Sequence, residues 1–65
     1  MSQNLTTRQQ DVLRLICAEH STAQIADILQ LSVNTVETHR KNLFRRLGVR
    51  NAMGLVKYAI ENQLL

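Results

Sequence analysis

The sequence lacks proline altogether, and its 65 residues include only two glycines and a single cysteine. With so few turn-forming residues, an all-β architecture that needs many tight turns is poorly supplied. One cysteine cannot form an internal disulfide or supply a cysteine-rich zinc site, so the fold needs no oxidising compartment. No unbroken apolar run approaches the roughly 18 residues of a membrane span, and no signal-peptide pattern is visible. We therefore expect a cytoplasmic domain with no membrane contact.

Catalytic patterns are also missing. The spacing supports no Ser/His/Asp or Cys/His set, and no glycine-rich phosphate loop is present. A domain of this length buries only about 60% of its unfolded surface, which leaves little room for a catalytic cleft. Cys17 and His20 have a spacing that could hold a metal, but further ligands are not close in sequence. We expect no enzymatic activity, no metal site, no cofactor and no small-molecule ligand.

What the chain does have is positive charge in one place. Eight Lys and Arg residues against five Asp and Glu give a formal net charge of +3. Five of these cations fall in a segment, 40–50, that contains no acidic residue. They are Arg40, Lys41, Arg45, Arg46 and Arg50. A cluster of this kind suits a polyanionic partner, although a solvated helix face would have the same composition.

Start signals divide the first half of the chain into two helices. Thr6 and Gln9 match a capping box that opens a helix reaching about Glu19. Ser21 and Gln24 repeat the pattern and open a short second helix. The apolar residues of the two helices are Val12, Leu13, Leu15, Ile16, Ile25, Ala26, Ile28 and Leu29.

Two more helices follow in the second half. Ser32 can cap a third helix from Val33 to about Leu47, with Gly48 as its left-handed terminator. Asn51 can cap a fourth helix that ends near residue 62. The expected inward stripes are Val33, Val36, Leu43 and Leu47 on the third helix, and Ala52, Val56, Ala59 and Ile60 on the fourth. The predicted fold is all-α, a compact four-helix bundle.

The break between the second and third helices is the most informative one. Two helical turns, an interruption of about three residues around Leu31 and a longer helix are typical of a helix-turn-helix, here over about 20–41. Ala26 is small where the two helices must cross, and Leu31 can fill the space beneath the turn. The first and fourth helices would then cover the remaining apolar faces.

A continuous polar surface lies opposite the apolar stripe of the third helix on a helical wheel. We call this surface the polar ridge; its members are Asn34, Glu37, Thr38, Lys41 and Arg45. Such side chains suit the base edges of a DNA major groove, which admits one α-helix. Lys41 and Arg45 suit phosphate or guanine. Glu37 could accept from a cytosine amino group, or it could only pair with Lys41 one turn away.

Ser32, Asn34 and Thr35 lie at the start of this helix, where free backbone amides and the helix dipole favour a phosphate. Arg40 projects nearer the apolar stripe, so its stem could pack while its guanidinium reaches a backbone phosphate.

In these residues the chain resembles the LuxR/FixJ-type helix-turn-helix domain of bacterial response regulators and quorum-sensing activators. The resemblance covers almost the whole chain. It rests on Leu5-Thr6-Thr7-Arg8, Val12-Leu13, Ile25-Ala26, Leu29, the run from Leu31 to Arg40, the run from Leu47 to Asn51, and Leu64-Leu65. Glu19 and Gln63 depart from it, because the family commonly has glycine at both positions.

The resemblance implies that residues 1–65 are one DNA-binding output domain of a transcription regulator, and a two-component response regulator is the expected context. The third helix would enter the major groove of double-stranded DNA. The expected base contacts are Asn34, Glu37, Thr38 and Lys41, and the expected phosphate contacts are Thr22, Ser32, Thr35, Arg40 and Arg45.

The fourth helix, over about 51–62, is the usual dimerisation element of this family. A homodimer would bind an inverted repeat in a promoter or operator, associate with the nucleoid and present itself to RNA polymerase. The expected interface residues are Met53, Gly54, Lys57, Tyr58 and Glu61. Glycine destabilises a helix relative to alanine. Gly54 could be present because a partner helix approaches it closely, or it could simply be tolerated.

Two other functions stay open from the sequence. A sigma-factor region-four-like module has a similar helix-turn-helix. A protein-interaction domain that heterodimerises with a regulator would not bind DNA at all; Glu37 and Ala23 would then be its signature.

Overall fold

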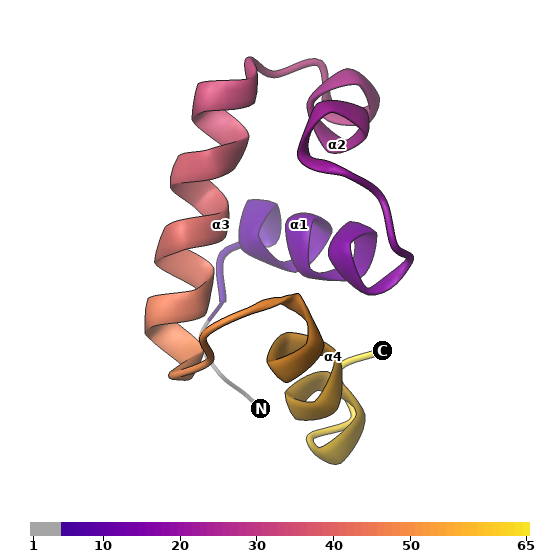
Figure 1. Cartoon of the computed structure of the whole chain (residues 1–65), viewed down its shortest axis with the longest axis vertical. Coiled ribbons are helices and arrows are strands. Elements are labelled where there is room, and N and C mark those ends of the chain that lie inside the picture. Colours follow the sequence, from indigo (N-terminus) through magenta and orange to yellow (C-terminus); the bar gives the residue numbers. More distant parts are fainter. Residues whose placement is uncertain (1–4) are drawn as a thin grey trace.

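The computed structural model describes residues 5–65, which form four α-helices and no strand (Figure 1). The helices are α1 (Thr7–Cys17), α2 (Thr22–Leu29), α3 (Val33–Leu47) and α4 (Ala52–Glu61). The all-α fold with four helices is confirmed; the first four residues of the predicted domain lie outside the described range. In Figure 1, α3 runs along one side of the molecule, and the other three helices lie on its inner side. None of the helices within residues 5–65 has the length and apolar character to cross a membrane.

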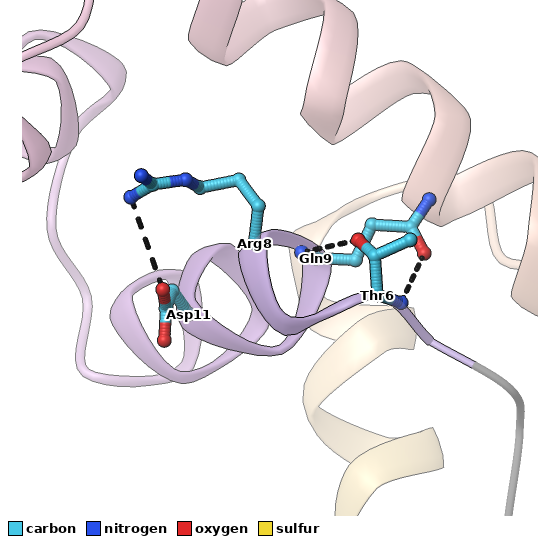
Figure 2. Close-up of polar contacts among 4 residues, drawn as sticks. All are labelled: Thr6, Arg8, Gln9 and Asp11. Carbon is cyan, nitrogen blue, oxygen red and sulfur yellow. Dashed lines mark hydrogen bonds and ion pairs between the residues drawn. The ribbon is translucent and has the colours of Figure 1, made fainter.

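Both predicted capping boxes are present. The Gln9 amide donates to Thr6 Oγ1 at 3.0 Å, and the Thr6 amide donates to Gln9 Oε1 at 3.1 Å (Figure 2). Ser21 and Gln24 make the same reciprocal pair at 3.1 and 2.9 Å. Each pair satisfies two amides that a helix start leaves without partners. These bonds are local in sequence, and this is why the starts of α1 and α2 could be predicted.

The predicted starts of α3 and α4 and the predicted end of α3 are also confirmed. The Ser32 and Asn51 side chains accept from the amides of Thr35 and Gly54 at 3.0 and 2.8 Å. Gly48 follows α3 with φ of 70°, the left-handed conformation in which glycine carries no Cβ penalty.

Among residues 5–65, three residues other than glycine also adopt left-handed backbone conformations: Glu19, Gln30 and Gln63, with φ of 69°, 57° and 57°. A residue with a Cβ is less stable in this region by about 1–2 kcal/mol. The predicted end of the first helix near Glu19 was therefore two residues too late, since the helix stops at Cys17 and Glu19 already reverses the chain. Glycine would adopt the conformation of Glu19 and Gln63 without a Cβ penalty.

The core lies where α1, α3 and α4 meet, and α2 closes one end of it. Its buried members are Val12, Leu13, Ile16, Ile25, Ala26, Val36, Leu43, Leu47, Leu55 and Ala59. The prediction that Val33 belongs to the inward stripe of α3 was wrong, because its side chain is 47% exposed. Val33 is the first residue of α3, and the buried residues of this helix begin only at Val36.

The predicted faces of α4 were also partly wrong. Leu55 is fully buried although it was absent from the predicted stripe, and Ile60 is 63% exposed although it was assigned to it. Tyr58, expected outside, is half-buried and packs against the core. The inward face is thus centred on Leu55 and Ala59, which lie one turn apart.

Replacing Gly54 by alanine is expected to raise the free energy of unfolding by about 1 kcal/mol, because alanine is the better helix former. An added Cβ would lie 3.4 Å from Asn51 Oδ1 and 3.7 Å from Val49 Cβ, and both are ordinary contacts. Thermal unfolding of dilute protein measures the change. Gly48→Ala is the matched control and should lose stability, since its φ is 70°. A gain in stability that comes with weaker self-association would show that a partner helix approaches Gly54; a loss of stability would contradict the prediction.

Candidate nucleic-acid interface

The turn between α2 and α3 fixes how the two helices cross. Gln30 is left-handed, and the Leu31 amide donates to the Ala26 carbonyl at 2.9 Å, which ends α2. Leu31 is half-buried and packs against the core, as predicted, so it fills the space beneath the turn. Ala26 is 6% exposed, as the close crossing requires. Ser32 then caps α3 immediately.

All members of the polar ridge are exposed, while Val36, Leu43 and Leu47 on the opposite side of α3 are buried. The outer side of α3 is the side away from the other helices in Figure 1. The ridge is thus a free surface along a helix of 15 residues. At 1.5 Å per residue such a helix is about 22 Å long, enough to lie across a major groove.

Two ridge residues have defined hydrogen-bonding states. The Thr38 hydroxyl donates to the Asn34 carbonyl at 3.1 Å, so its proton is already used within the helix. The methyl group and the oxygen lone pairs of Thr38 are what it has to offer a base. Within residues 5–65, Glu37 forms no ion pair with Lys41. An ion pair does form between Arg8 and Asp11 on α1, at 3.8 Å (Figure 2). The carboxylate of Glu37 is therefore available as an acceptor.

The first turn of α3 holds two of the predicted phosphate contacts. The Ser32 and Thr35 hydroxyl oxygens lie 2.8 Å apart and share one hydrogen bond, and the Thr35 amide donates to Ser32 Oγ. This arrangement orders both hydroxyls at the positive end of the helix dipole. The first turn contains no acidic residue that would repel an anion.

One open cleft of about 730 Å³ brings together side chains that are distant in sequence. Thr22 from the first turn of α2 and Arg40 from the middle of α3 line the same cleft, together with Met53 from α4. The Arg40 guanidinium carbon lies 5.0 Å from the centre of the Phe44 ring, a cation–π distance. Arg40 is half-buried, and its guanidinium lies against the Phe44 ring, which restricts where its charge can be.

Most of the acid-free basic segment is on or beside the ridge. Lys41 and Arg45 belong to the ridge, and Arg46 and Arg50 follow near the carboxyl end of α3. Cations in the last turn also complement the helix dipole there, which is a purely structural reason for Arg45 and Arg46. The exposure of Arg45 leaves it able to serve both roles.

The exposed side of α4 carries Met53, Lys57, Ile60 and Glu61, with Met53 82% exposed. Three of these were predicted as interface residues, and Ile60 was not. Gly54 and Tyr58 are half-buried, so they offer a partner less surface than the wheel suggests.

The remaining candidate, Cys17, is half-buried, and burial raises the pKa of its thiol. No group of three or more metal-ligating side chains occurs in the part of the chain that the structure describes.

Sequence reasoning missed Val33, Phe44 and Ile60 as surface or supporting residues. Each is apolar, and each was read as core or passed over for that reason. The signal that could have been noticed for Val33 is its place directly after the N-cap Ser32, at the very start of the helix.

Comparison with known proteins places the chain in a family. A sequence model described as bacterial regulatory proteins, luxR family, matches residues 3–59. The transcriptional regulatory protein MctR of Rhizobium johnstonii is 42% identical over 64 residues, which cover 98% of this chain and 30% of MctR. The response regulatory protein YgeK of Escherichia coli is 43% identical over 56 residues, 86% of this chain and 38% of YgeK.

The oxygen regulatory protein NreC of Staphylococcus aureus is 36% identical over 61 residues, 94% of this chain and 28% of NreC. The chain thus spans about a third of the length of the curated relatives it matches. The family model covers most of the chain and the four-helix fold agrees with it. The chain belongs to the LuxR family of bacterial regulatory proteins, a family of DNA-binding transcription regulators.

Proposed function

We propose that this domain binds double-stranded DNA sequence-specifically, with α3 in the major groove, as the effector domain of a transcription regulator. The observation that carries the proposal is the polar ridge, exposed along the outer face of α3 and continuous with the acid-free basic segment. Asn34, Glu37, Thr38 and Lys41 would contact bases because they offer acceptors, donors and a cation along one face. The work done is positioning on promoter DNA, without a chemical step.

Phosphate contacts at both ends of the polar ridge would hold α3 in place in the groove. Ser32 and Thr35 present their ordered hydroxyls at the amino end of α3, and Arg45 its cation towards the other end. Thr22 and Arg40 line one cleft, so a single DNA strand passing it could meet both. Contacts to the sugar-phosphate backbone fix orientation without reading sequence.

A homodimer through α4 would place two such ridges on an inverted repeat. The exposed face of α4 combines apolar Met53 and Ile60 with Lys57 and Glu61. In a two-fold interface the same patch meets itself, so Lys57 of one protomer can meet Glu61 of its partner twice. The apolar pair would supply the buried centre.

Binding to a random-sequence duplex, followed by selection from a random duplex library, tests the proposal. We expect binding at low salt whose logarithmic salt slope is about −0.9 for each cation that meets a phosphate, and an enriched motif with two-fold symmetry. Two relatives support the proposal by name, since MctR is named a transcriptional regulatory protein and YgeK a response regulatory protein. If no duplex is bound at low salt, DNA binding is refuted and heterodimerisation with a full-length regulator becomes the better hypothesis.

A further inference from the structure

Val33 is the one large apolar side chain exposed in the first two turns of α3. It is 47% exposed, whereas Val36 in the next turn is fully buried. A β-branched side chain that is this exposed contributes little to the core, and valine is not among the strong helix formers. Packing within the chain therefore does not account for the apolar character of Val33.

The surroundings of Val33 indicate what could cover it. Glu37 lies one turn further on, about 40° round the helix from Val33, so the side chain borders the polar ridge. The Ser32 hydroxyl next to it is engaged with Thr35 at 2.8 Å. The surface beside Val33 continues into the ridge with Lys41 and Arg45, whose charge favours a polyanion over an apolar protein face.

A DNA major groove presents one prominent apolar group, the C5-methyl of thymine. The amino-terminal residues of a recognition helix are those that contact base edges in helix-turn-helix complexes. We propose that Val33 contacts a thymine methyl group and makes this domain prefer thymine at one position in each half-site. The inference rests on the proposed DNA binding and extends it by one specificity-determining residue.

Deoxyuridine offers a direct test, since it differs from thymine only by the missing methyl group. In a duplex enriched by selection, each thymine is replaced in turn by deoxyuridine, and the dissociation constant is measured. The expected result is one position per half-site at which the wild-type protein loses about fourfold in affinity, the effect of one methyl-sized apolar contact. Val33→Ala should bind both duplexes equally at that position, and Val33→Ile should keep the difference.

Ile28→Ala is the matched control, because Ile28 is similarly exposed, at 49%, but lies on α2 outside the ridge. It should keep the wild-type response to deoxyuridine. The salt slope of Val33→Ala should equal that of the wild type, since no charge changes.

The possible results distinguish a failure of the proposed DNA binding from a failure of the proposed role of Val33. Selection without any enriched duplex would refute the proposed function and this inference with it. An enriched duplex whose deoxyuridine penalty is the same for wild type and Val33→Ala, or is absent throughout, would overturn the role of Val33 and leave DNA binding standing. Loss of the penalty in Val33→Ala alone supports it.

Discussion

Reversing both cations of the polar ridge, Lys41→Glu together with Arg45→Glu, is expected to weaken binding to a selected duplex by more than about a hundredfold. A contact of this kind to guanine or phosphate contributes about 1–3 kcal/mol, and each new carboxylate would also face the phosphates. Both side chains are exposed, so the fold should survive, with a small loss at the carboxyl end of α3 where Arg45 complements the dipole. Fluorescence anisotropy gives the affinity, and circular dichroism confirms the helices.

Arg8→Glu with Arg14→Glu makes the control. These residues lie on α1, and the double substitution changes the net charge by the same amount. Only the long-range field would change at the DNA, and salt screens it beyond about 10 Å, so a loss of a few-fold is expected. If both double variants lose the same affinity, binding follows net charge alone, and the ridge is not the interface.

Truncating Leu55 to alanine should have the largest effect on stability. Leu55 is fully buried on the face of α4 that packs against α1. Removing a buried leucine side chain destabilises a protein by about 2–5 kcal/mol through lost burial and the cavity left behind. A core of this size rarely supplies more than about 3–5 kcal/mol, so we expect Leu55→Ala to be largely unfolded at 37 °C. Urea unfolding followed by circular dichroism measures the loss.

Met53→Ala on the same helix is the comparison, since Met53 is 82% exposed. Its unfolding free energy should stay within about 0.5 kcal/mol of the parent at a protein concentration that keeps the chain monomeric. A stable Leu55→Ala variant would mean that α4 does not pack through the face centred on Leu55 and Ala59.

Helix starts and the tight turn were predictable because their determinants are close in sequence. Thr6, Ser21, Ser32 and Asn51 each accept from an amide three residues on. Such a bond depends on the residue type and the spacing, and both are visible in the chain. The end of α1 was not predictable in this way, because Glu19 is left-handed without being glycine.

The face of α4 could not be read for a different reason. Gly54, Lys57 and Glu61 are the only residues of this helix that are not apolar, so a wheel offers no unique stripe. Which side is buried depends on α1 and α3, and this information is tertiary. The prediction that Val33 is buried failed for a similar reason. A helical wheel gives the angle of Val33 about the axis of α3, but it does not show where the neighbouring helices end.

The ridge itself was predictable because its five residues share one helix, and their exposure follows from the buried stripe opposite. What the sequence could not show is the cleft that Thr22 and Arg40 share, or the ring of Phe44 beneath the Arg40 charge. The cleft depends on how separate helices pack together, and the contact of Arg40 with Phe44 depends on the side-chain rotamers. The base and phosphate contacts of these residues remain predictions.

Within the part of the chain that the structure describes, every buried core side chain is apolar, and no polar or charged side chain is buried. Acid and salt should therefore change the stability of the core little, because no buried side chain there carries a charge or takes up a proton. A decline in DNA affinity with rising ionic strength then reports the counterions that are released from the DNA on binding, and not unfolding of the protein. The fold is therefore expected to depend less on ionic strength than DNA binding does.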